Sequence, residues 1–186
     1  MSPFAAKTEY KREEASTDLD ALLKDISEGS QDALAQLYRY TRSSVYSFAL
    51  SILKNTHDAE DVLHDCYVSV WHGAAGYRSQ GKPLAWMMTI TRNLCLQRIR
   101  ERRKTADIPQ EEWTLHLPDD GRLTMEEKCV LSACLEKLSA QERQIVTLFA
   151  VSGFKHREIA TLLELPLSTV LSKYHRAIKR LKQHLQ

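Results

Sequence analysis

Glycine and proline are scarce in this chain of 186 residues, with 6 glycines and 5 prolines. A sandwich or barrel of many short strands needs turns that are rich in these residues, so their scarcity favours long helices. No apolar run approaches the ~18 residues needed to cross a bilayer, and the opening segment MSPFAAKTEYKREE has no apolar core of signal-peptide length. We therefore expect an all-α protein that resides in the cytoplasm.

The chain also lacks the common motifs of cysteine, metal and nucleotide chemistry. Its cysteines are Cys66, Cys95, Cys129 and Cys134. They form no CxxC pair, which favours reduced, buried thiols. No GxGxxG, GxxxxGK[ST], HExxH or GxSxG motif is present. His57, Asp61 and His64 share one helical face, but no fourth ligand is evident. We expect no catalytic residues, no cofactor and no metal site.

The formal net charge is only +2, but the charges are segregated along the chain. Residues 105–123 carry five acids against one arginine, contain two prolines and have no helical period. Basic runs flank this acidic strip: Arg98, Arg100, Arg102, Arg103 and Lys104 before it, and Lys173, Arg176, Lys179, Arg180 and Lys182 after it. Two such runs indicate two modules that face nucleic acid. Each run alone is also compatible with an ordinary solvated helix end.

Apolar residues recur every three or four positions over most of the chain, which predicts helices. The expected helices are a short one that ends at Gly29, then about 30–52, 58–71, 83–104, 125–138, 140–152, 157–163 and 168 onward. The expected caps are Ser16 or Thr17, Ser30, Asp58 and Ser168, with capping boxes at Thr124…Glu127 and Ser139…Glu142. We expect two small helical domains, residues 18–104 and 124–186, joined by a flexible acidic linker, residues 105–123, and preceded by a disordered segment, residues 1–17.

The most specific pattern lies in residues 154–178, FKHREIATLLELPLSTVLSKYHRAI. A short amphipathic helix, a tight turn at Glu164-Leu165-Pro166 and a second helix predict a helix-turn-helix. Ser172, His175, Arg176 and Lys179 share one face of the second helix. The short polar groups at its start fit the major groove, and the long cations further on reach phosphates, so we expect DNA binding.

This segment resembles region 4 of the sigma-70 family, in which a helix-turn-helix reads the minus-35 promoter element. Residues 58–71, DAEDVLHDCYVSVW, resemble region 2.2, and residues 76–104, GYRSQGKPLAWMMTITRNLCLQRIRERRK, resemble regions 2.3 and 2.4. Regions 1.1 and 3 are missing, as in the extracytoplasmic-function (ECF) group of alternative sigma factors. The resemblance implies a non-enzymatic protein that binds core RNA polymerase and promoter DNA, promotes transcription initiation and is controlled by an anti-sigma factor.

The resemblance also implies roles for particular residues. The polymerase-binding candidates are Asp58, Glu60, Asp61, His64 and Asp65. The minus-10 candidates are Tyr77, Arg78, Ser79, Gln80, Lys82, Trp86, Arg92, Asn93, Gln97 and Arg100. The minus-35 candidates are Ser168, Thr169, Leu171, Ser172, Lys173, His175, Arg176 and Lys179.

Several points stay open at the level of sequence. Pro83 and Leu84 stand where the family often has an aromatic residue, and Leu171 stands where many members carry a basic one, so the base preference is not predicted. Trp86 is either a core residue or part of the DNA surface. A stand-alone DNA-binding regulator is the alternative function, but it leaves residues 18–104 and the acidic linker without a role.

Overall fold

The computed structural model describes residues 18–78, 81–105 and 135–184, and every regular element in these ranges is a helix. The expected all-α class is confirmed. The predictions for residues 1–17, for residues 106–123 of the linker and for the Thr124…Glu127 capping box lie outside the described residues. Among the described helices, none is both long enough and apolar enough to span a membrane.

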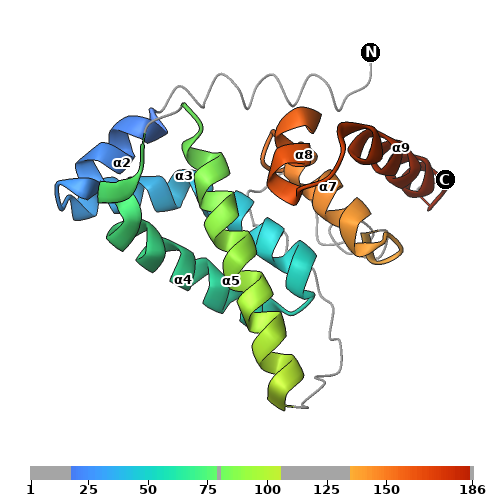
Figure 1. The fold of residues 1–186 in the computed structure, drawn as a ribbon, viewed down its shortest axis with the longest axis horizontal. Helices are drawn as coiled ribbons and strands as arrows, with labels where there is room; N and C mark the ends of the chain where they lie inside the picture. The colour runs from blue at the N-terminus through green and yellow to red at the C-terminus, as the bar shows by residue number, and fades with distance from the viewer. Residues whose placement is uncertain (1–17, 79–80, 106–134, 185–186) are drawn as a thin grey trace.

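The N-terminal half is a bundle of three long helices with a short helix across one end (Figure 1). The long helices are α3 (Gln31–Leu53), α4 (Thr56–Gly73) and α5 (Pro83–Thr105), and each packs against the other two. The short helix α2 (Leu19–Ser27) packs mainly on α3 and on a 3₁₀ turn, η1 (Ala74–Gly76). Pro83 is the first residue of α5, where its missing N–H costs nothing.

Two helix starts in this half differ from the sequence prediction. Asp18 caps α2, because its carboxylate accepts from the N–H groups of Asp20 and Ala21. Asn55, and not Asp58, caps α4: the Asn55 side chain accepts from the N–H of Asp58 at 2.9 Å. The helix thus begins two residues earlier than expected. Ser30 caps α3 as predicted.

The C-terminal half consists of α7 (Ala140–Ala150), α8 (His156–Leu163) and α9 (Leu167–His184). The predicted Ser139…Glu142 capping box opens α7, with both of its hydrogen bonds formed. Glu164, with a left-handed φ of 56°, ends α8 and turns the chain into α9. The carbonyl of Pro166 accepts from Thr169 and Val170, so α9 begins at Leu167. Ser168 therefore lies inside the first turn and is not the cap that the sequence predicted.

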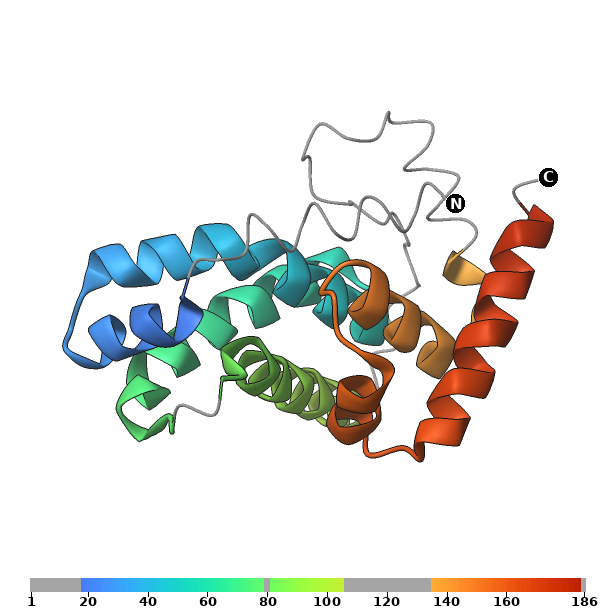
Figure 2. The same ribbon diagram turned by 90° about the horizontal axis from the view of Figure 1, so that it is seen from above.

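The two halves pack against each other, α7 on α3 and α8 on α5, whereas α9 lies on α7 and α8 at the outer side (Figure 2). Buried apolar residues of both halves share the same clusters; one cluster contains Leu50 and Leu53 of α3 together with Leu138 and Val146. Helical periodicity identified these apolar stripes but not what covers them. The boundaries of two separate domains stay a prediction.

Candidate polymerase and promoter interface

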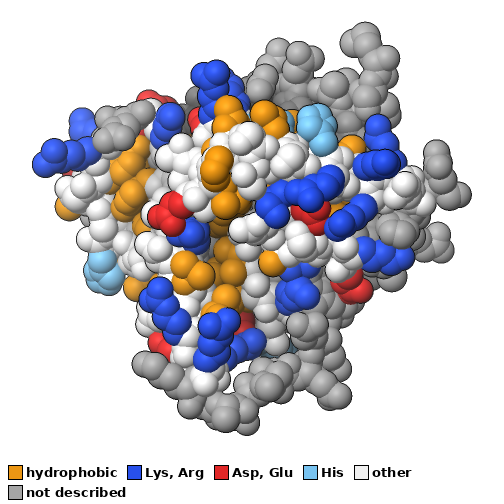
Figure 3. Space-filling view, turned by 45° about the vertical axis from the view of Figure 1, so that its right-hand side comes forward, with side chains coloured by type: hydrophobic (Ala, Val, Ile, Leu, Met, Phe, Trp, Pro, Cys, Tyr) orange, Lys and Arg blue, Asp and Glu red, His pale blue; other side chains and the backbone are white. Residues whose placement is uncertain are grey.

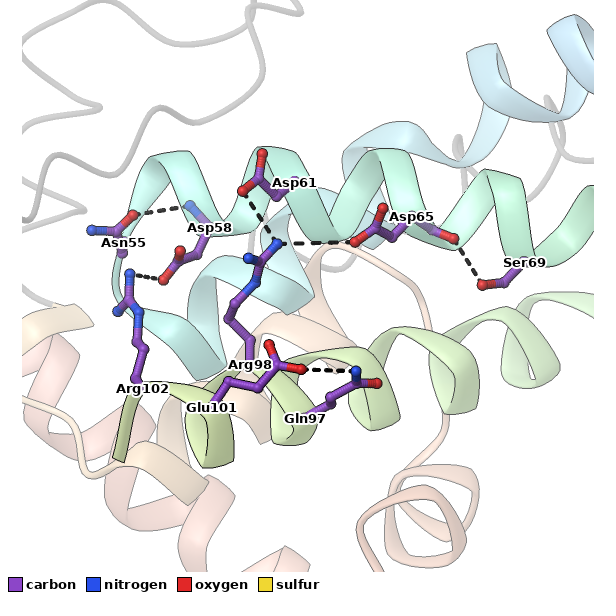
Figure 4. A network of polar contacts seen from close by, with 9 residues as sticks. All are labelled: Asn55, Asp58, Asp61, Asp65, Ser69, Gln97, Arg98, Glu101 and Arg102. Carbon is purple, nitrogen blue, oxygen red and sulfur yellow. Dashed lines mark hydrogen bonds and ion pairs between the residues drawn. The ribbon is translucent and has the colours of Figure 1, made fainter. Parts of the chain in front are cut away.

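The acids predicted for polymerase binding lie on α4, opposite basic side chains of α5 (Figure 4). Arg98 Nη2 lies 3.2 Å from Asp61 Oδ2 and 3.9 Å from Asp65 Oδ2. Arg102 pairs in the same way with Asp58, which is buried. We expected these acids to bind polymerase and the basic run that contains these arginines to face nucleic acid, but here Asp58, Asp61 and Asp65 pair with Arg98 and Arg102.

These ion pairs divide the predicted polymerase-binding acids of α4 into a buried residue and exposed ones. Asp58 is held at the α4–α5 interface and faces Arg102 instead of solvent. The side chains of Asp61 and Asp65 remain 60% and 53% exposed, so a partner can reach both. Glu60 and His64 are also exposed on α4. The reachable candidate surface for polymerase therefore comprises Glu60, Asp61, His64 and Asp65.

The basic run of α5 divides in the same way. Arg98 and Arg102 turn toward α4, whereas Arg100 and Arg103 are exposed. Asn93, Gln97 and Arg100 recur at spacings of four and three and are all exposed, so they form one stripe along the helix. Gln97 Nε2 donates to Glu101 Oε1 at 2.9 Å. This stripe is the part of the predicted minus-10 set on α5 that lies open to solvent.

Two aromatic residues anchor the loop before α5. The rings of Tyr77 and Trp86 lie 4.9 Å apart between centroids, and Tyr77 Oη donates to Asp20 Oδ1 at 2.9 Å. Both rings are half-buried against the core, so Trp86 is an edge-of-core residue that keeps part of its surface open. Arg78 and Lys82 are exposed, and the candidates Ser79 and Gln80 lie outside the described residues.

Two minus-10 candidates meet acids from the C-terminal half. Arg92 Nη2 lies 3.3 Å from Glu164 Oε2, and Lys82 Nζ lies 4.0 Å from Glu158 Oε1. Arg143 of α7 adds a third link, because its Nε donates to the carbonyl of Ser51 on α3 at 2.9 Å. These roles of Glu158, Glu164 and Arg143 could not be predicted from the sequence, because no local pattern says which elements meet in space.

The minus-35 candidates lie on the recognition helix α9, and most of them are open to solvent. The exposed members are Ser168, Leu171, Ser172, His175, Arg176 and Lys179, and the half-buried ones are Thr169 and Lys173. Arg176 Nε donates to the carbonyl of Ser172 at 3.3 Å, so its guanidinium lies along the exposed face. Val170 and Ala177 point inward and are fully buried. On the face shown in Figure 3, Lys and Arg side chains are more frequent than Asp and Glu.

An aromatic cluster fixes how α8 and α9 meet. The His156 ring stacks on Phe149 at 4.8 Å and meets Tyr174 edge-on at 4.7 Å. Burial, and to a lesser extent the neighbouring His175, lower the pKa of His156. Burial also raises the pKa of Tyr174. Both groups are thus held neutral near pH 7, as an apolar contact between two helices requires.

Comparisons with known proteins agree with this geometry. The family model of sigma-70 region 2 matches residues 37–105, and that of sigma-70 region 4 matches residues 130–181. The ECF RNA polymerase sigma factor SigK of Mycobacterium ulcerans is 28% identical over 177 residues, which cover 91% of this chain and 95% of that protein. SigK of Mycobacterium sp. (strain KMS) is 29% identical over 181 residues, 91% of each chain.

Two solved structures share the fold. The structure of CnrH in complex with the cytosolic domain of CnrY has a TM-score of 0.62 at 24% identity and covers 89% of this chain and 96% of that one. The sigma factor RpoE in complex with the anti-sigma factor NepR from Bartonella quintana has a TM-score of 0.68 at 24% identity, with 81% and 95% covered. With both family models matched in order on the two halves of an all-α fold, this chain belongs to the ECF group of the sigma-70 family of transcription initiation factors.

Proposed function

We propose that this chain binds core RNA polymerase through α4, recognises minus-10 and minus-35 promoter elements through α5 and α9, and so directs transcription initiation. The observation that carries the proposal is the exposed face of α9, where short polar side chains at the start are followed by Arg176 and Lys179. This order matches a helix whose first turns enter the major groove while later cations contact the phosphates.

The N-terminal half supplies the other two contacts. Asp61 and Asp65 give α4 an exposed acidic edge that a basic or polar surface of polymerase complements. The Asn93–Gln97–Arg100 stripe of α5 offers amide and guanidinium groups to a DNA strand. The half-buried rings of Tyr77 and Trp86 contact each other near the start of α5, where an unpaired base can stack.

The chain acts by binding and not by catalysing a reaction. Its proposed contacts are ion pairs, hydrogen bonds and stacking, and they require neither a cofactor nor a metal. Because core polymerase and the chromosome share the cytoplasm, we place its action there. Two structural neighbours are bound to CnrY and to the anti-sigma factor NepR, which supports control of this chain by an anti-sigma factor as well.

The test is transcription by bacterial core polymerase with and without this chain, followed by sequencing of transcript starts. We expect new start sites that share two upstream elements. The variant Asp61→Asn/Asp65→Asn is expected to lose these starts, while the matched control Asp25→Asn/Glu28→Gln, which changes exposed acids near the end of α2, keeps them. Identical start sites with and without the chain would refute the proposed function.

A further inference from the structure

The interface between the two halves contains side chains that are buried, as in a hydrophobic core. Leu138 and Val146 of the C-terminal half are buried in one apolar cluster with Leu50 and Leu53 of α3. Separation of the halves would return this apolar surface to water, which costs free energy. The packed arrangement is therefore a stable state of the chain, and an open state must compete with it.

Arg143 is the polar centre of this contact. It is only 1% exposed, and its guanidinium donates to the Ser51 carbonyl at 2.9 Å and to the Leu138 carbonyl at 3.4 Å. Ser51 lies in the last turn of α3, where carbonyls lack an intrahelical partner and a cation is favoured by the helix dipole. The hydrogen bond to Ser51 exists only while the two halves are together.

The same closure places negative charge on the proposed minus-10 surface. Glu158 and Glu164 reach Lys82 at 4.0 Å and Arg92 at 3.3 Å, both on the α5 side. A DNA phosphate that approaches these two cations meets carboxylates already in place and is repelled by them. Among the described residues, in contrast, nothing covers the face of α9 in this way: Ser172, His175 and Arg176 are exposed.

We propose that closure of the chain masks one side only: carboxylates of the C-terminal half neutralise Lys82 and Arg92 of the minus-10 surface, whereas the minus-35 surface of α9 stays open. This inference rests on the proposed function. Opening at the Arg143 contact must precede the contact of Lys82 and Arg92 with a DNA strand. The apparent affinity for a minus-10 strand is then the affinity of the open state multiplied by the open fraction, so a closed fraction of about 90% weakens binding about tenfold.

The experiment compares the full-length wild-type chain with two opening variants and one control. Arg143→Lys keeps the charge but loses the forked donor set that reaches two carbonyls. Glu158→Gln/Glu164→Gln removes both ion pairs, and a glutamine at 158 can still accept from the Lys155 N–H, as Glu158 Oε2 does at 2.9 Å. Glu136→Gln is the matched control, because Glu136 is exposed and takes part in neither the Lys82 nor the Arg92 ion pair. Circular dichroism verifies that each variant is folded.

Two quantities are measured on each chain. Small-angle X-ray scattering gives the radius of gyration without DNA. Binding is measured to the single non-template strand of the minus-10 region and to the minus-35 duplex, both taken from transcript starts mapped with core polymerase. We expect the opening variants to expand and to bind the single strand several-fold more tightly, with the larger effect in Arg143→Lys, because exposed ion pairs contribute little. Binding to the minus-35 duplex is expected to change less than about twofold, since α9 is open in both states.

Unchanged size and unchanged strand binding in both opening variants would overturn the inference, as would expansion with no gain on the single strand. Failure of the proposed function gives a different result, because core polymerase with the wild-type chain would then produce no new start sites. In that case the size measurement still decides whether Arg143 holds the two halves together.

Discussion

His156 lies between two aromatic rings, and its Nε2 is buried with no hydrogen-bond partner among the described residues. Protonation would place a charge in this site without a partner, which is why burial lowers the pKa of His156. The unfolded chain binds a proton near the ordinary pKa of about 6.5, and the folded chain does so only at lower pH. The contribution of His156 to stability is therefore complete above the unfolded pKa and falls as the pH drops from there toward the folded pKa.

Replacement of His156 by phenylalanine should remove the loss of stability at low pH, because phenylalanine keeps the ring stack but binds no proton. We expect the free energy of unfolding to fall less for His156→Phe than for the wild type between about pH 7 and about pH 5. Urea titrations at the two pH values measure the difference. An equal fall in both proteins would show that the His156 proton is not coupled to folding.

Two kinds of DNA contact are compatible with the position of Arg176, because from α9 it can reach either a guanine edge or a phosphate. We favour base readout, since Arg176 lies on the exposed face with Ser172. Arg176→Ala should then cost about 1–3 kcal/mol on the cognate promoter and relax the preference at one base pair. Binding to cognate and scrambled duplexes over a salt series measures both effects.

Lys179→Ala is the matched comparison, one turn further along α9. It should weaken binding about equally on all sequences and lower the log–log salt slope by about one, as a phosphate contact does. If Arg176→Ala shows this second pattern, Arg176 contacts the backbone. If Arg176→Ala changes neither affinity nor slope, this face of α9 does not meet DNA.

At the scale of elements, the α4–α5 ion pairs can serve packing or partner binding. Exposed pairs such as Arg98–Asp61 contribute at most about 1 kcal/mol to stability. We therefore expect both Arg98→Gln and Asp61→Asn/Asp65→Asn to leave the fold intact. The acid variant should weaken binding to core polymerase much more than Arg98→Gln, because only the acids are proposed to touch the partner.

Co-elution with core polymerase and thermal unfolding are the two measurements. Equal losses of polymerase affinity in the two variants, in proportion to their losses of stability, would assign these side chains to the packing of α4 on α5 alone. Asp58 is not a suitable probe, because it is buried against Arg102 and its replacement would disturb the start of α4 directly.

At the scale of the whole molecule, the two expected domains share apolar clusters, so the stability of each half depends on the other. Separate fragments 18–104 and 124–186 should each stay helical, because each has its own apolar stripes. Each should also unfold at a lower temperature than the same half does in the intact chain, since Leu50 and Leu53 on one side and Leu138 and Val146 on the other lose their cover.

Circular dichroism during heating measures this on both fragments and on their equimolar mixture. Two fragments that are both unfolded at low temperature would show that the chain is one cooperative domain. Fragments as stable as the intact chain would show that the contact between the halves contributes nothing to folding, and the masked state would lose its basis.

Much of the local structure followed from sequence because its causes are local. The Ser30 cap, the Ser139…Glu142 box, the Pro83 start and the helix-turn-helix depend on residues within a few positions of one another. The shifted caps are near misses of the same kind: Asn55 and Asp58 are both good N-cap residues, and which one caps is decided by where the preceding helix ends.

The partners of charged side chains were decided only by tertiary structure. Arg98 and Arg102 belong to a basic run whose charge clustering indicated nucleic acid or a solvated helix end, yet in space they face the acids of α4. Glu164 meets Arg92 across 72 positions of sequence, and Arg143 meets Ser51 across 92. Sequence by itself determined the helices, their apolar stripes and the exposed face of α9, because these depend on spacing along the chain. Which stripe covers which, and which charges remain free for a partner, depends on the packing of helices that are distant in sequence, and no local pattern encodes it.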